Sequence, residues 1–204
     1  MRDPTRLIDG GRAMQWSIMG RVATVVHPHV EPGVFDALQE NAGWSMDVEL
    51  INGEAVLVPP VGDTASSAQG ELYLALRRWQ EDMADEGRVL QDVFVAFPEG
   101  SRSAPDISWW SAERLSPFSG GAVDSVPDLA VEVLSPSTRA NDEGIKREVY
   151  LDSGVRELWL VDPEVRSVTR VRPDGPDQVL SAKDRLSSDL LAGFTMEIAR
   201  IFRH

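Results

Sequence analysis

Apolar and polar positions divide the chain into short segments whose spacing distinguishes strands from helices. Two largely apolar runs flank Asn52-Gly53 within residues 47–58, a pattern typical of a tight β-hairpin. Apolar side chains then recur at helical spacing, which predicts a long helix over 63–86, ended by Gly87. The positions that indicate this helix are Leu72, Leu76, Trp79 and Met83.

The second half of the chain centres on one apolar run. Residues 129–134 are apolar apart from Glu132, as expected for a central strand that is buried on both faces. The order of all the elements predicts a mixed α/β sheet with helices packed on it. The remaining expected elements are helices over 34–40, 112–115 and 141–153, strands over 89–97, 106–110, 156–161 and 167–171, and a final strand pair with one strand near 190–198. Residues 1–30 contain at most a short strand, so we expect an N-terminal extension followed by one domain over 31–204.

The composition excludes several classes of protein. The chain has no cysteine and three histidines, which excludes disulfide scaffolds, cysteine-ligated zinc or iron–sulfur sites and thiol catalysis. No apolar run approaches the roughly 18 residues of a membrane span, and the N-terminus does not resemble a secretory signal. We therefore expect a cytoplasmic protein that makes no membrane contact. The formal net charge of −13 argues against nonspecific coating of nucleic acid by a basic surface.

The candidate chemistry depends on carboxylates in the predicted sheet. Glu132 interrupts an apolar strand, and a buried carboxylate is costly unless it is paired or binds a metal. Asp106 begins a different strand and can lie beside Glu132 if the two strands are neighbours. Asp128 shares the strand of Glu132, but four residues separate them by roughly 13 Å, so they cannot easily share one ion. The alternative for Glu132 is a partly open face or an arginine partner.

A lysine follows on the helix after the central strand. Asp142, Lys146 and Tyr150 fall on one helical face, and the alternative interpretation is a surface Asp–Lys pair. Two carboxylates and a lysine are the groups that metal-assisted phosphodiester hydrolysis requires, and carboxylate oxygens suit Mg²⁺ or Mn²⁺. In this interpretation Lys146 orients the nucleophile or stabilises developing charge on the phosphate.

Five short motifs of this chain form a common pattern. They are Pro105-Asp106, Val131-Glu132-Val-Leu-Ser135-Pro-Ser-Thr138, Asp142 with Lys146 and Tyr150, Gly154-Val-Arg-Glu-Leu-Trp-Leu-Val-Asp-Pro163 and Val48-Glu49-Leu-Ile-Asn-Gly53. Together they resemble the Uma-type family of restriction-endonuclease-like proteins, within the PD-(D/E)xK nuclease superfamily. The resemblance runs from about Val34 to Ile198. It implies a restriction-endonuclease-like α/β fold, in which helices flank a mixed β-sheet.

The resemblance also implies roles for particular residues. The acidic pair of the superfamily maps to Asp106 and Glu132, and Glu49 matches a recurrent glutamate that could be a further metal ligand. The superfamily lysine normally lies two residues after the second acid, where this chain has Leu134, and the family pattern moves it to Lys146. The family often has a histidine at the start of its long helix, where this chain has Ser67 or a neighbour.

Three functions remain open from the sequence. The first is a metal-dependent endonuclease that hydrolyses DNA, with attraction to DNA from Arg102, Arg139 and Arg147 or from a partner. The second is a noncatalytic interaction or dimerisation module on the same fold. The third is hydrolysis of another phosphoester, because fold does not fix substrate. A homodimer would suit cleavage of both DNA strands.

Overall fold

The computed structural model describes residues 25–26, 29–42, 48–58, 60–117 and 119–203. Most of the predicted N-terminal extension therefore lies outside the described residues. Within it, Val25–Val26 forms β1, which pairs with β3 of the following hairpin. The boundary near residue 30 stays a prediction. In the described part of the chain, no helix combines the length and the apolar character that crossing a membrane requires.

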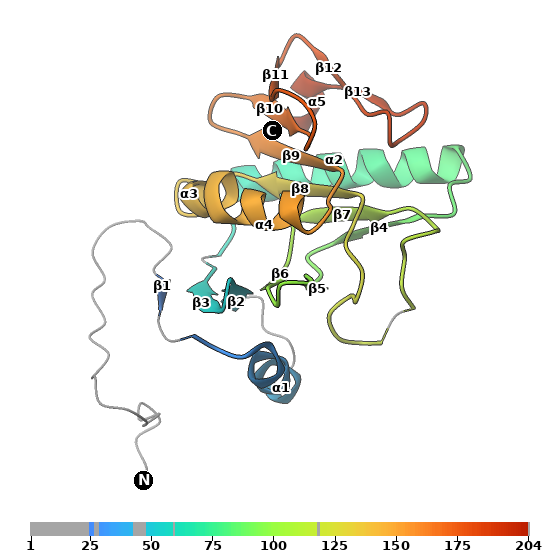
Figure 1. The fold of residues 1–204 in the computed structure, drawn as a ribbon. Helices are drawn as coiled ribbons and strands as arrows, with labels where there is room; N and C mark the ends of the chain where they lie inside the picture. The colour runs from blue at the N-terminus through green and yellow to red at the C-terminus, as the bar shows by residue number, and fades with distance from the viewer. Residues whose placement is uncertain (1–24, 27–28, 43–47, 59, 118, 204) are drawn as a thin grey trace.

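A six-stranded mixed sheet forms the centre of the fold (Figure 1). Its strand order is β11-β10-β9-β8-β7-β4, and β8 is parallel to β9 and antiparallel to β7. The strands are β4 (Arg88–Gln91), β7 (Ile107–Trp110), β8 (Leu129–Val133), β9 (Glu157–Asp162), β10 (Ser167–Val171) and β11 (Gln178–Ser181). Every residue of β8 and β9 is buried, which confirms the central strand that the apolar run predicts.

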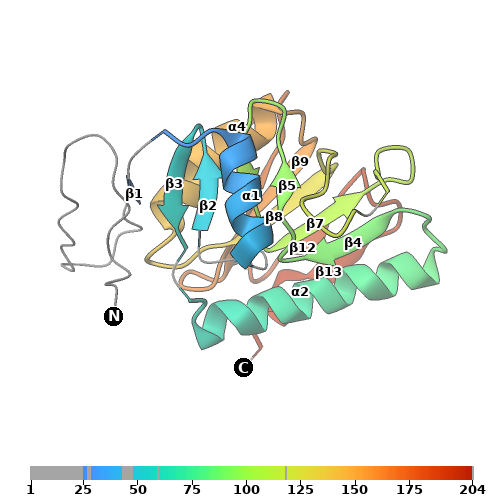
Figure 2. The ribbon, with the colours of Figure 1, turned by 90° about the horizontal axis from the view of Figure 1, so that it is seen from below.

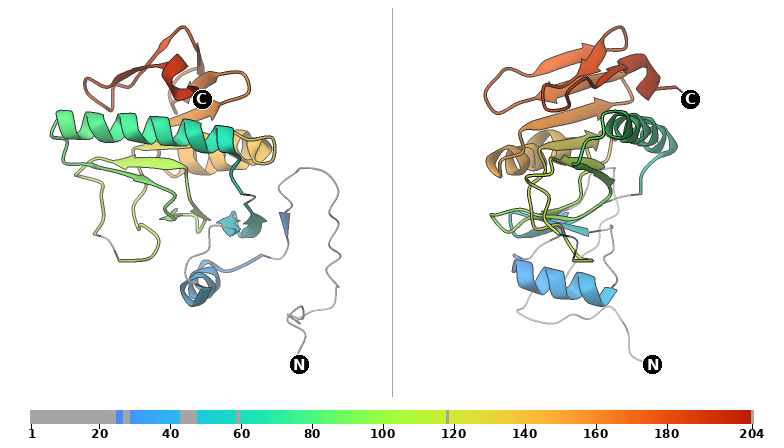
Figure 3. Two further views of the ribbon diagram at one scale, coloured as in Figure 1. Left: turned by 180° about the vertical axis from the view of Figure 1, so that it is seen from behind. Right: turned by 90° about the vertical axis from the view of Figure 1, so that its right-hand side faces the viewer.

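Helices cover both faces of this sheet, as the right-hand view of Figure 3 shows. Alternate residues of β8 explain the two layers: Leu129, Val131 and Val133 pack with the long helix α2 (Asp63–Asp82), whereas Ala130 packs with Tyr150 on the opposite side. That opposite layer consists of α3 (Arg139–Asn141), a π-helical turn η1 (Asp142–Lys146) and α4 (Arg147–Asp152). Glu132, in phase with Ala130, faces this second layer.

A smaller sheet lies beside the large one (Figure 2) and has the strand order β1-β3-β2-β6-β5. Its hairpin turns at Asn52 and Gly53, whose φ values of 50° and 80° match the turn that the sequence predicts. Helix α1 (Pro32–Ala42) packs on it through Phe35, which contacts the cluster around Leu50. The strands are β2 (Val48–Ile51), β3 (Glu54–Leu57), β5 (Val95–Ala96) and β6 (Arg102–Ser103).

Several predicted boundaries were wrong. The long helix ends at Asp82, four residues early, because Ala84 adopts a left-handed φ of 49°. The predicted strand over 89–97 is two strands in two different sheets, separated at Asp92 with φ 51°. Residues 112–114 form a turn where a short helix was expected. The final segment forms β12 (Arg185–Ser187), β13 (Thr195–Glu197) and an unpredicted helix α5 (Ile198–Ile201).

Candidate functional site

The strand register brings the two predicted acids together. β7 and β8 pair Ile107 with Val131, and continuing this antiparallel register by one residue sets Asp106 opposite Glu132. Residues directly opposite each other in such a pair project to the same face of the sheet. The Asp106 carboxylate also accepts a hydrogen bond of 2.5 Å from the backbone N–H of Val133. The sequence analysis required the strands of Asp106 and Glu132 to be neighbours, and the structure meets this condition.

The π-helical turn η1 positions Lys146 beside these acids. Gly144 inside this turn has φ −103° and ψ −107°, outside the regions that residues with a side chain favour. The Lys146 Nζ lies 2.8 Å from Glu132 Oε1, 3.4 Å from Glu49 Oε1 and 3.4 Å from Asp142 Oδ1. Its side chain is 8% exposed, so the amine faces the acids and is shielded from bulk water.

Two hydroxyl groups complete the arrangement. The Tyr150 hydroxyl donates to Glu132 Oε1 at 2.6 Å and lies 2.8 Å from Ser103 Oγ. Ser103 Oγ in turn donates to Glu49 Oε1 at 2.9 Å. Glu49 arrives on β2 of the small sheet and Glu132 on β8 of the large sheet, so these contacts join the two sheets at the site.

Negative charge exceeds positive charge at this junction. Burial raises the pKa of Glu132 well above its ordinary value, and Asp142, Asp106 and Glu49 raise it further, against the effect of Lys146. Burial likewise raises the pKa of Asp142, and that of Asp106 to about 7. Burial alone would lower the pKa of Lys146, but Glu132 and Glu49 outweigh it and raise the value. One ammonium therefore cannot balance the four carboxylates, and the site favours a proton or a further cation.

Sequence reasoning missed part of the site. Asp142 was placed on the face of Lys146, but the surface pair considered for it is a buried one. Ser103 gave no signal, because β6 has two residues and no readable periodicity. Gln69 lies two residues beyond Ser67, and its buried amide donates to the Asp106 carbonyl at 3.0 Å and to Asp92 Oδ1 at 2.7 Å. It thus holds the start of β7 from the α2 side.

Asp128 does not join the site, as its distance along β8 predicted. Its side chain is buried at the other end of the strand, where Arg114 and Arg156 each approach Oδ1 at 3.1 Å. Burial alone would raise the pKa of Asp128, but hydrogen bonds from Ser111 and the two arginines outweigh it and lower the value. This carboxylate is a fully balanced structural group.

Comparisons with known proteins identify the family and the fold of the chain. A family model described as "Uma2: Putative restriction endonuclease" matches residues 34–199. The chain belongs to this Uma2 family. A solved structure described as "a putative nuclease belonging to DUF820" from Anabaena variabilis ATCC 29413 is similar, with a TM-score of 0.71 and 21% sequence identity. The match covers 85% of this chain and 97% of that chain, and it shows the same fold. A comparison with curated proteins gave no match.

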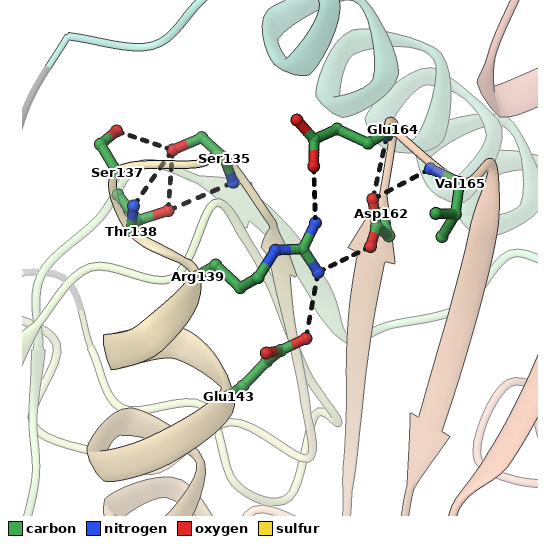
Figure 4. A network of polar contacts seen from close by, with 8 residues as sticks. All are labelled: Ser135, Ser137, Thr138, Arg139, Glu143, Asp162, Glu164 and Val165. Atoms are coloured by element: carbon green, nitrogen blue, oxygen red, sulfur yellow. Dashed lines mark hydrogen bonds and ion pairs between the residues drawn. The ribbon is translucent and has the colours of Figure 1, made fainter. Parts of the chain in front are cut away.

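The arginines expected to attract DNA are engaged in ion pairs. Arg102 forms two hydrogen bonds of 2.9 and 3.0 Å to Asp36, and Arg147 forms two of 2.7 and 2.9 Å to Asp177. Figure 4 shows Arg139, which contacts three carboxylates. They are those of Asp162 at 2.7 Å, Glu143 at 3.2 Å and Glu164 at 3.3 Å. None of the three arginines offers an unbalanced positive charge in this arrangement, and Arg139 instead ties the start of α3 to the end of β9.

The cavity beside the site is small. It lies between the β2–β3 hairpin and η1, has a volume of about 20 Å³, and is lined in part by Glu49, Asp142 and Lys146. That volume suits about one water molecule. A larger cavity of about 320 Å³ lies between α2 and the C-terminal segment, lined by Trp79 and Phe194, away from the four carboxylates.

Proposed function

We propose that this chain is a metal-dependent nuclease that hydrolyses phosphodiester bonds in DNA. Asp106 and Glu132 hold Mg²⁺ or Mn²⁺, and Lys146 assists the attack on the phosphate. The observation that carries the proposal is the pair of opposed carboxylates, Asp106 directly before β7 and Glu132 on β8, with an ammonium 2.8 Å from Glu132. Membership of the Uma2 family and the likeness to a described nuclease support it.

The residues fit such a cation. Magnesium binds through one or two carboxylates and completes its shell with water and substrate oxygens. Among the described residues, no group of three or more acids and histidines is arranged as a cage for a metal, so a two-carboxylate site is the arrangement that fits. A divalent cation would also offset the excess of negative charge. When bound, it would lower the pKa of a coordinated water and polarise the phosphate.

The protein's own side chains provide access to the site, the ammonium group and the contacts that hold it. Asp106 is partly exposed and gives access to the site, whereas Glu132 and Lys146 lie beneath the surface. Because the cavity at Lys146 holds about one water, the lysine or the β2–β3 hairpin has to shift before an ammonium hydrogen bond to a phosphate oxygen can form. Glu49 accepts hydrogen bonds from Ser103 and the Ala104 N–H, so it anchors Lys146, and its role as a further metal ligand stays a prediction.

A noncatalytic interaction module is the second candidate. The engaged arginines and the small cavity favour it, because neither offers a ready surface for duplex DNA. The predicted homodimer is compatible with both candidate functions. In a nuclease it would present two sites to the two strands of one duplex. Light scattering coupled to size-exclusion chromatography measures it directly.

Plasmid nicking with Mg²⁺ or Mn²⁺ separates the two candidates. We expect cleavage by the wild type and a loss of about 10²–10³-fold in Glu132→Ala and Lys146→Ala, since removing a group that stabilises transition-state charge typically costs that much. Lys183→Ala is the matched control, because Lys183 is the other lysine of the chain and is exposed. Calorimetric titration of the metal into the wild type and Asp106→Ala measures ligation separately. Equal cleavage by the wild type and both site variants would refute the assignment.

A further inference from the structure

Five polar atoms form a closed ring at the junction of the two sheets. They are Glu132 Oε1, Tyr150 Oη, Ser103 Oγ, Glu49 Oε1 and Lys146 Nζ, joined by contacts of 2.6, 2.8, 2.9, 3.4 and 2.8 Å in that order. Tyr150 is fully buried and Ser103 is 1% exposed. Each hydroxyl has one proton: that of Tyr150 goes to Glu132, and that of Ser103 goes either to Glu49 or to the Tyr150 oxygen.

The ring uses one oxygen of each glutamate. Within the described part of the chain, every contact recorded for the Glu132 and Glu49 carboxylates goes to Oε1. Oε2 of Glu132 accepts no hydrogen bond from the described residues, so it is the oxygen left for a ligand. Carboxylates that bind metals are commonly hydrogen-bonded by an outer group, which fixes their orientation.

The aromatic ring of Tyr150 provides its packing, and the hydroxyl adds nothing to it. The ring stacks on Phe97, with centroids 5.1 Å apart and an angle of 26° between the planes. Phenylalanine would preserve this stacking, whereas a buried hydroxyl is costly unless it is hydrogen-bonded. The hydroxyl therefore acts through its contacts with Glu132 and Ser103.

We propose that Tyr150 and Ser103 are positioning residues that hold Glu132 in the orientation in which its second oxygen ligates the divalent cation. The inference rests on the proposed function, and adds two residues to it. Removing the Tyr150 hydroxyl deletes a direct hydrogen bond to Glu132, and removing the Ser103 hydroxyl deletes the group 2.8 Å from the Tyr150 oxygen, so each change weakens cation binding. Because both hydroxyls belong to one bridge, their effects are not additive.

Calorimetric titration of Mn²⁺ tests this in Tyr150→Phe, Ser103→Ala and the double variant. We expect 10–100-fold weaker binding in each single variant, typical of outer-shell partners, and little further loss in the double variant. Two matched controls remove hydroxyls elsewhere. Ser108→Ala removes a buried hydroxyl that has no hydrogen-bond partner in the described structure, and Tyr73→Phe alters a half-buried tyrosine on α2. Both controls should bind Mn²⁺ like the wild type.

A second readout separates positioning from general damage to the fold. The increase in melting temperature on adding Mn²⁺ should shrink in Tyr150→Phe, even if its melting temperature without metal equals that of the wild type. If Asp106→Ala loses Mn²⁺ binding but Tyr150→Phe and Ser103→Ala keep full affinity, the positioning role is refuted and the proposed function stands. If the wild type itself binds no Mn²⁺, both proposals fail.

Discussion

Two buried carboxylates on one strand have opposite surroundings. Asp128 directly precedes β8 and Glu132 lies within it, four residues apart and in phase with the same face of the sheet. Asp128 has two arginines and a backbone N–H, so its charge is balanced and its pKa is lowered. Glu132 shares one ammonium with other acids, so its pKa is raised. The comparison shows that the supply of cations, more than burial, distinguishes a structural acid from a candidate functional one.

Removing Lys146, the ammonium shared by Glu49, Glu132 and Asp142, should have the largest effect on stability. Lys146→Met leaves buried carboxylates without their partner, so we expect a loss of about 3–5 kcal/mol in the free energy of unfolding. Urea denaturation, followed by circular dichroism, measures it. Adding Mn²⁺ should restore more stability to this variant than it adds to the wild type, because the cation replaces the lost charge. An unchanged denaturation midpoint would show that the acids do not depend on Lys146.

Removing the charge of Asp128 should have the second-largest effect on stability. Asp128→Asn keeps the shape of the side chain but loses the charge that Arg114 and Arg156 share. We expect a loss of about 2–3 kcal/mol, less than for Lys146, since both arginines can turn towards water. Cleavage per folded molecule should stay at the wild-type level. A variant that is stable but inactive would contradict the structural role given to Asp128.

The carboxylates of Asp106, opposite Glu132, and of Asp128, just before β8, should also respond to pH with opposite sign. The pKa of Asp106 is about 7 in the folded protein and near 3.8 unfolded, so its contribution to stability is complete below about pH 4 and is lost as pH rises through 7. The lowered pKa of Asp128 gives a contribution that is present above about pH 4 and is lost as pH falls further.

Unfolding free energies measured from pH 3 to 8 test this contrast. Asp106→Asn should flatten the decline between about pH 4 and 7, and Asp128→Asn should flatten the loss at lower pH. Since water screens the partly exposed Asp106, we expect a smaller change than in Asp128→Asn at neutral pH. Equal slopes in the wild type and Asp106→Asn would disprove the raised pKa.

Glu132→Gln should change stability least. Glutamine keeps the shape of the side chain without its charge, and its carbonyl can still accept from Tyr150 and Lys146. The free energy of unfolding should therefore stay within about 1 kcal/mol of the wild-type value, since relief of repulsion offsets the weaker hydrogen bonds. Cation affinity should nevertheless fall. A large destabilisation would place Glu132 in the same structural class as Asp128.

The local sequence pattern was sufficient to predict the elements whose turn residues or apolar residues follow a regular spacing. The Asn52-Gly53 turn and the apolar run around Glu132 each have one structural interpretation, and both were confirmed. The π-helical turn at Gly144 and the division of the 89–97 segment at Asp92 depend on backbone angles that no periodicity records. The arginines illustrate the same limit, because Asp36 and Asp177 are far from Arg102 and Arg147 in sequence.

The sequence by itself determined the family, the α/β fold and the three residue types of the candidate site, because alternation, turn residues and short motifs act over a few neighbouring positions. Only the tertiary structure decided which charges meet. Glu49 reaches Glu132 through Ser103 and Tyr150 because two sheets and a helix converge there, and Asp128 is excluded because its own arginines arrive from other loops. Coulomb and hydrogen-bond energies depend on distances across the fold, which spacing along the chain does not specify.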